Sequence, residues 1–132
     1  MTVSLNTRIT DMLGCQYPII QTAMGWVADP RLVAGTCSAG GFGFLAGATI
    51  PPEQMEAVIK KTKELTDKPF GVNFHMYQPN APQIVDMVVE HGVRAVSYSR
   101  SPGKDMVKKL KDAGVICIPT IGLPKHAAKA IE

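Results

Sequence analysis

Two polar side chains interrupt an otherwise apolar segment, Phe70–Met76, near the middle of the chain. Asn73 lies at the centre of this segment, where a buried amide has to find hydrogen-bond partners. Its oxygen and NH2 group together suit the edge of a planar heteroaromatic ligand, although bonds to neighbouring backbone would also satisfy the amide. His75 lies near the carboxyl end of the segment and is the candidate there for a general acid or base. A purely structural histidine is the alternative interpretation.

A second stretch with possible chemistry is Pro18–Val27, which begins apolar and ends in small, flexible residues. Its apolar beginning is typical of a strand covered on both faces, as in a parallel sheet or barrel. The glycine at position 25 would allow a tight turn and a close approach to a ligand. Ligands of α/β folds bind at the carboxyl ends of the strands. The first wall of a binding site is therefore expected at Ala23, Met24, Gly25 and Trp26, with a buried strand that simply turns as the alternative.

The segment Gly41–Ala46 matches the dinucleotide-binding fingerprint GxGxxG/A by letter. That fingerprint requires a strand before the glycines and a helix after them, whereas here a helical pattern precedes and a strand pattern follows. We therefore predict a tight helix-to-strand turn and not a Rossmann site. The cysteines and histidines show no metal-ligand spacing, so no metal site is predicted. His91 and His126 are predicted to lie at the surface.

The composition describes a globular protein with one domain, 1–132, that is large enough to bury a core. Of its residues 45% are hydrophobic and 19% are charged, and the net charge is +3. The lysines fall mostly on helices with apolar opposite faces, so no nucleic-acid surface is predicted. We find no secretory signal and no apolar run of membrane length, so no membrane attachment is expected. Three scattered cysteines are typical of a reducing compartment, which predicts a cytoplasmic protein.

Strand and helix patterns alternate along the chain. Strands are expected at 18–24, 42–47, 70–76, 95–99 and 115–122. Asn80 and Gln83 resemble a capping box at the start of one helix. The other long helices are expected to start at Asp29-Pro30, Pro51-Pro52, Ser101-Pro102 and Leu123-Pro124.

This alternation is the βα pattern of a parallel sheet. Sequential units with right-handed crossovers become neighbours in such a sheet. We predict a (β/α)8 barrel of the TIM type, of which this chain contains about the first five units, because a whole barrel needs eight units and typically ~250 residues. A five-stranded doubly wound sheet is the alternative that the length would accommodate.

Four segments occur in an order that resembles a known family: Thr7–Ile9, Pro18–Gly25, Ser38–Leu45 and Lys68–Asn73. Together they resemble the amino-terminal half of the nitronate monooxygenase (2-nitropropane dioxygenase) family, which are flavin-dependent barrels related to the flavin enoyl-acyl-carrier-protein reductases. The resemblance covers essentially the whole chain and is more specific for the superfamily than for the substrate. It implies an FMN cofactor at the carboxyl ends of the strands, with contacts at Ala23, Met24, Gly25 and Asn73.

The resemblance also implies that the active-site histidine of the family would follow after Glu132, which leaves His75 as the catalytic candidate within this chain. Many monooxygenases of the family have a smaller residue where this sequence has Trp26. At that position the sequence resembles a branch that acts on acyl-CoA thioesters. We therefore expect Trp26 on the substrate side of the flavin.

The resulting hypothesis is an FMN-dependent oxidoreductase that oxidises alkyl nitronates with molecular oxygen, with a small-molecule substrate as its main partner. An FMN-dependent reductase or dehydrogenase of enoyl- or acyl-CoA is the first alternative. A non-catalytic fragment or binding half is the second. We expect this chain to be a truncated barrel, inactive alone, that binds FMN weakly or not at all and that self-associates through open sheet edges or needs its missing half.

Overall fold

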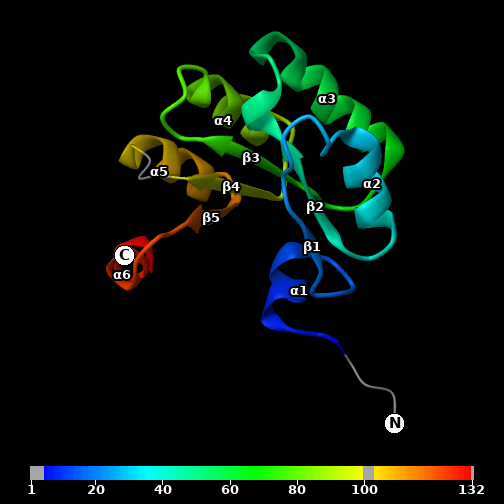
Figure 1. Ribbon diagram of the computed structural model, residues 1–132, viewed down its shortest axis with the longest axis horizontal. Coiled ribbons are helices and arrows are strands. Elements are labelled where there is room, and N and C mark those ends of the chain that lie inside the picture. Colours follow the sequence, from blue (N-terminus) through cyan, green and yellow to red (C-terminus); the bar gives the residue numbers. More distant parts are fainter. Residues whose placement is uncertain (1–4, 100–102, 132) are drawn as a thin grey trace.

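The computed structural model describes residues 5–99 and 103–131, which fold into alternating strands and helices (Figure 1). The strands are β1 (Ile20–Gln21), β2 (Phe42–Ala46), β3 (Gly71–His75), β4 (Ala95–Ser99) and β5 (Ile116–Thr120). The helices are α1 (Arg8–Leu13), α2 (Pro30–Ser38), α3 (Pro52–Leu65), α4 (Ala81–Glu90), α5 (Lys104–Asp112) and α6 (Pro124–Ile131), and a short 3-10 turn, η1 (Gly47–Thr49), follows β2. Among these described helices, none combines the length and the apolar character needed to cross a membrane.

The five strands form one parallel sheet in the order β1-β2-β3-β4-β5, so each strand pairs with its neighbours in sequence. The sheet curls into part of a barrel, and α2, α3, α4 and α5 pack in succession around its outside (Figure 1). We call this arrangement of β1–β5 and α2–α5 the half-barrel. It confirms the predicted TIM-type βα units. A doubly wound sheet is excluded, because its strand order reverses and its helices cover both faces.

The two faces of the sheet are packed differently. Side chains alternate between the faces along each strand. The convex face is turned to the helices and forms the main core, in which each of these strand residues is at most 4% exposed: Leu45, Val72, Phe74, Val96 and Tyr98. The concave face contains a smaller apolar cluster of Leu13, Phe42, Phe44 and Ala95. The half-barrel is therefore stabilised mainly from its convex side, which leaves the concave side for other contacts.

The predicted start of α2 is confirmed. The side chain of Asp29 accepts a hydrogen bond from the backbone N–H of Leu32 at 2.9 Å, and Pro30 occupies the first helical position. The chain leaves this helix through Gly40, whose φ of 95° favours glycine. Gly41–Ala46 then runs into β2, so a helix precedes the glycines and a strand follows them. This order confirms the predicted turn and excludes the dinucleotide fingerprint.

The first strand is shorter than predicted. The sequence pattern predicts a strand over 18–24, but only Ile20 and Gln21 pair with β2. Ile19 and Ile20 are 63% and 45% exposed. This run is not covered on both faces, because β1 pairs with a single described strand and the chain leaves the sheet at Thr22.

Two further local predictions are wrong. The side chain of Asn80 does not cap α4, because its Oδ1 accepts a hydrogen bond from Gln78 Nε2 at 2.6 Å instead. His91 is not a surface residue, since its side chain is only 14% exposed and its Nε2 lies 3.3 Å from Glu56 Oε1. His126 is exposed, as predicted. The predicted helix start at Ser101-Pro102 lies outside the described residues.

Candidate functional site

The concave face carries polar side chains at the carboxyl end of the sheet. In the sheet register Asn73 of β3 lies opposite Ser97 of β4, and His75 lies opposite Ser99. All four are half-buried, whereas the intervening Phe74 is fully buried on the helix side. Because residues two apart share a face of a strand, the four side chains lie on the concave face. They form two polar rows near the carboxyl ends of β3 and β4, Asn73 with Ser97 and His75 with Ser99.

Asn73 is held through its own amide nitrogen. Its Nδ2 donates hydrogen bonds to the backbone oxygen of Ser97 at 3.1 Å and to Ser97 Oγ at 2.8 Å. A carbonyl oxygen can only accept, so the Asn73 atom that faces it has to be the nitrogen. Nδ2 is therefore bound to Ser97, and Oδ1 accepts no hydrogen bond from a described residue. The alternative interpretation, in which the amide bonds neighbouring backbone, describes the nitrogen, whereas Oδ1 is open and ligand contact at Asn73 stays a prediction.

His75 is fixed from three directions. Its Nδ1 lies 2.7 Å from Ser99 Oγ, and its backbone N–H donates to Gln78 Oε1 at 2.9 Å. Its ring stacks on Tyr77, with ring centroids 5.4 Å apart and an interplanar angle of 21°. The contact with Ser99 engages Nδ1 and leaves Nε2 without a partner among the described residues. Nε2 is thus available for proton transfer, and the role of His75 as acid or base stays a prediction.

The loop after β1 turns at Trp26. Its φ of 61° is the one left-handed value among the described non-glycine residues, and its side chain is 89% exposed. The backbone N–H of Trp26 donates to Thr49 Oγ1 at 3.4 Å, which ties this loop to the turn after β2. The sequence predicts this turn at Gly25, which instead packs closely, since a Cβ there would lie 3.1 Å from Thr49 Cγ2. Trp26 lies outside the core, as expected, and its place on the substrate side stays a prediction.

This loop fits the chemistry of the flavin that the resemblance implies. Ala23 packs against the concave apolar cluster that includes Phe44, so the loop lies on the same side of the sheet as Asn73. Within the described residues, the backbone N–H groups of Ala23, Met24 and Gly25 donate to no protein acceptor. A flavin ring has carbonyl oxygens and an imide N–H, which require donors and an acceptor. The three N–H groups and Asn73 Oδ1 supply both.

Gln21 is a half-buried polar residue at the end of β1 that the sequence did not indicate, and its side chain lies on the helix-facing side of the sheet, near Val33 of α2. Its Nε2 donates to the backbone oxygen of Phe44 at 3.4 Å, where the ladder between β1 and β2 ends. Its Oε1 is buried and has no partner in the described structure. Gly43 makes room for it, since a Cβ there would lie 2.9 Å from this oxygen. No sequence signal identifies Gln21, because its contacts depend on the register of β1 against β2.

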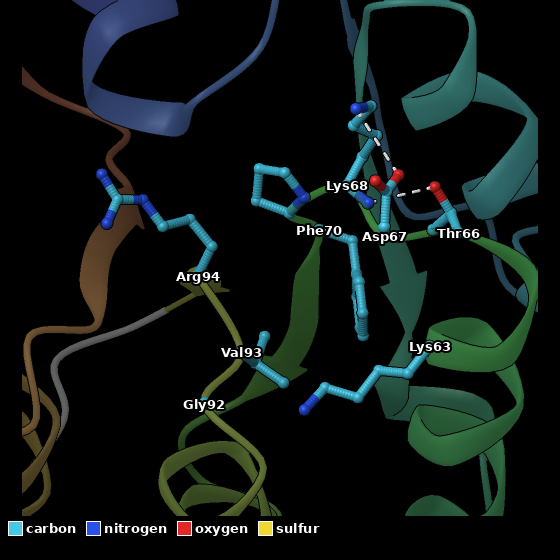
Figure 2. Close-up of a pocket in the computed structure, with 9 residues that line it drawn as sticks. Lys63, Thr66, Asp67, Lys68, Phe70, Gly92, Val93 and Arg94 are labelled. Atoms are coloured by element: carbon cyan, nitrogen blue, oxygen red, sulfur yellow. Dashed lines mark hydrogen bonds and ion pairs between the residues drawn. The ribbon is translucent and has the colours of Figure 1, made fainter.

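A cavity of about 420 Å³ lies at the opposite, amino-terminal end of the sheet. Figure 2 shows Lys63, Lys68 and Arg94 among the residues that line it. Each cation already has a partner. Lys63 Nζ donates to the His91 carbonyl at 2.5 Å, and Lys68 Nζ lies 3.5 Å from Asp67 Oδ1. Arg94 Nε donates to the Met12 carbonyl at 3.0 Å. The amino-terminal end of a βα barrel contributes to stability and not to the active site. We therefore do not take this cavity as the functional site.

Two of the three thiols lie at this same end of the sheet, and the third, Cys117, lies within β5. Cys15 and Cys37 line a second cavity of about 240 Å³. Burial raises the pKa of both thiols, which keeps them protonated and weak as nucleophiles or metal ligands. Within the described ranges, no three His, Cys, Asp or Glu side chains gather in a group that could hold a metal ion.

The sequence and the fold of this chain are similar to those of known enzymes. Residues 6–88 match the family model described as nitronate monooxygenase. A (3aS,4S,5R,7aS)-5-hydroxy-7a-methyl-1-oxo-octahydro-1H-indene-4-carboxyl-CoA dehydrogenase of Rhodococcus jostii (strain RHA1) is 50% identical over 126 residues, which cover 96% of this chain and 36% of the relative. A nitronate monooxygenase of Pseudomonas aeruginosa is 41% identical over 75 residues, which cover 57% of this chain and 21% of the relative.

The fold is similar to that of FabK from Thermotoga maritima, in its M276A mutant. The TM-score is 0.90 at 30% identity, over 96% of this chain and 42% of FabK. The chain spans about a third of the length of the curated dehydrogenases that it matches.

Proposed function

The chain belongs to the nitronate monooxygenase family, and from this premise we propose that it forms the FMN-binding part of an oxidoreductase that acts on an acyl-CoA thioester. The dehydrogenase relative supports this substrate class, because its 50% identity extends over 96% of the chain. In the structure, the observation that carries the proposal is Asn73. Its unpartnered Oδ1 lies at the carboxyl end of the concave face, on the same side of the sheet as the loop after β1.

FMN supplies the two-electron chemistry when it is bound. Asn73 Oδ1 would accept a hydrogen bond from an N–H of the ring, and the backbone N–H groups of the 23–25 loop would donate to ring oxygens. Trp26 would present its exposed indole to the substrate. His75 would hold or move a proton at Nε2. The free thiols support a reducing compartment, so we place the protein in the cytoplasm.

Oxidation of an alkyl nitronate with molecular oxygen is the second candidate. It is supported by the family model over 6–88 and by the Pseudomonas relative. The identity to that relative extends over a smaller part of the chain. The exposed side chain of Trp26 also offers more contact area than a small nitronate can use. Both observations favour the thioester.

Flavin reduction in the complete protein that contains this chain tests the proposal. The purified protein should release FMN on denaturation, and chromatography distinguishes FMN from FAD. Without oxygen, an acyl-CoA thioester should bleach the flavin absorbance within a turnover. Bleaching by an alkyl nitronate alone, with oxygen consumption on readmission of air, would select the second candidate. A protein that retains no flavin would overturn both.

A further inference from the structure

Strand β4 supplies two serines that contact the polar side chains of β3. We propose that Ser97 and Ser99 are positioning residues, which orient Asn73 and His75 and thereby determine which atoms of these side chains face a ligand. The proposal concerns the same site as the proposed function. The expected effect of the serines on flavin affinity rests on that function, whereas their effect on the orientation of Asn73 and His75 is independent of it.

Ser97 contacts Asn73 through two acceptors. Its backbone oxygen at 3.1 Å fixes which end of the Asn73 amide is the nitrogen, and its Oγ at 2.8 Å is a second acceptor for that nitrogen. A rotation that turns Nδ2 away from Ser97 would lose both hydrogen bonds. Oδ1 is therefore kept as the ligand-facing atom. The Ser97 hydroxyl accepts from Asn73, so its own proton is left to serve as a donor beside Oδ1.

Ser99 has the same relation to His75 one row nearer the carboxyl end. Its Oγ lies 2.7 Å from Nδ1, while the Tyr77 ring restrains the plane of the imidazole. Because Nδ1 is engaged, Nε2 is the nitrogen that a ligand can reach. The Ser99 hydroxyl can donate to Nδ1 or accept from it, so the contact fixes the ring orientation in either tautomer. Ser99 thus decides that Nε2, and not Nδ1, faces a ligand.

The packing of β4 does not depend on either serine. Val96 and Tyr98, which alternate with the serines, face the main core and are 0% and 4% exposed. Both serines are half-buried on the concave face. Removal of one hydroxyl should therefore leave the fold intact. The matched control is Ser38→Ala, because the Oγ of Ser38 also bonds a hydroxyl, that of Thr66 at 3.0 Å, but at the other end of the sheet.

Nuclear magnetic resonance of selectively labelled protein without flavin tests orientation. In Ser97→Ala, the NH2 protons of Asn73 should shift and exchange faster with water, and Ser97→Thr should restore them because it keeps the hydroxyl. In Ser99→Ala, the ring nitrogens of His75 should change their 15N shifts. Ser38→Ala should change neither set. Unchanged Asn73 and His75 signals in the alanine variants would overturn the positioning role. If Ser97→Ala does not fold, Ser97→Cys is used in its place, because the thiol has a similar volume to the hydroxyl but is a weaker hydrogen-bond acceptor.

FMN titration of the complete apoprotein tests the consequence for the ligand. Loss of one neutral hydrogen bond should weaken FMN binding in Ser97→Ala by about three- to tenfold, and Ser97→Thr should recover most of this loss. A changed Asn73 signal with unchanged FMN affinity would overturn the claim that Oδ1 faces the flavin. A wild-type protein that binds no flavin would contradict the proposed function, while the resonance data would still decide the orientation.

Discussion

Trp26 adopts a backbone conformation that residues with a Cβ avoid, with φ at 61° and the side chain 89% exposed. The left-handed conformation costs such residues about 1–2 kcal/mol. We expect Trp26→Gly to raise the free energy of unfolding by about 1 kcal/mol, since glycine adopts this conformation readily. Trp26→Ala keeps the Cβ and should not gain this energy. Urea denaturation followed by circular dichroism measures both, and equal stability of the two variants would contradict the assignment of strain.

Asn73→Ala should weaken flavin binding in the complete protein by roughly 1–3 kcal/mol, because it removes the open acceptor and the amide that Ser97 holds. The flavin absorbance follows the titration, and the difference in fluorescence quenching between wild type and Trp26→Phe isolates the contribution of Trp26. Gln83→Ala, which removes an exposed amide on α4, is the control. Unchanged affinity in Asn73→Ala would make the residue structural. Absence of quenching in the wild type would contradict the predicted position of Trp26.

The candidate site shows how far single residues can be interpreted from sequence. Asn73 stands out because it is polar within an apolar strand, and the cap at Asp29 follows from its proline neighbour. Ser97 gives no such signal, since a serine in a strand is unremarkable until the register places it opposite Asn73. Which atom of the amide is open depends on the same register. Partners brought together by tertiary structure are not encoded in local spacing.

Among the elements, two glycines differ in what surrounds them. A Cβ on Gly71 of β3 would lie 2.2 Å from the Phe44 ring, whereas a Cβ on Gly35 within α2 would meet nothing within 4 Å. We expect Gly71→Ala to destabilise by about 1–3 kcal/mol through overpacking. Gly35→Ala should stabilise by about 0.5–1 kcal/mol through helix propensity. Thermal and urea denaturation measure both changes. Equal effects of the two substitutions would show that β3 can move away from β2.

Tyr98 of strand β4 leads us to expect a loss of stability at alkaline pH. Burial and the neighbouring Cys117 thiol raise the pKa of Tyr98 to about 12, from about 10 in an unfolded chain. The folded state therefore holds the phenolic proton more tightly, and this contribution is complete below pH about 10 and lost as the pH rises through about 12. Tyr98→Phe should reduce the fall in melting temperature over this range. Tyr77→Phe, which alters a ring that is 61% exposed, should not.

Strands that lie inside the sheet were predicted within one or two residues, as for β2 (Phe42–Ala46) and β4 (Ala95–Ser99). Their apolar runs and flanking turn residues define them locally. The first strand, expected over 18–24, was not, because its apolar beginning at 18–20 resembles a buried strand although Ile19 is 63% exposed. Whether that run is buried depends on the segments that pack beside β1, and the local sequence of β1 does not indicate them.

For the whole molecule, we propose that the 132-residue chain self-associates through its sheet edges. Within the described structure β1 pairs only with β2, and β5 pairs only with β4. Exposed edges with apolar side chains, such as that of Ile19, template further pairing. Sedimentation velocity should show oligomers that grow with concentration, and Ile19→Lys should reduce them. A monomer at every concentration would contradict this proposal and support a self-sufficient half-barrel.

The order of the strands has a consequence for how the chain acquires its structure. Every ladder of the sheet joins strands that are consecutive in sequence, so each pairing closes only one βα loop, which costs less chain entropy than pairing of strands far apart in sequence. Each unit can therefore add to the preceding one as the chain leaves the ribosome, where folding proceeds from the amino terminus. The hydrogen bond from Arg94 to the carbonyl of Met12 differs, because it joins residues 82 positions apart. It can form only after Arg94, which directly precedes β4, has been synthesised, and it then joins the first helix to the start of β4.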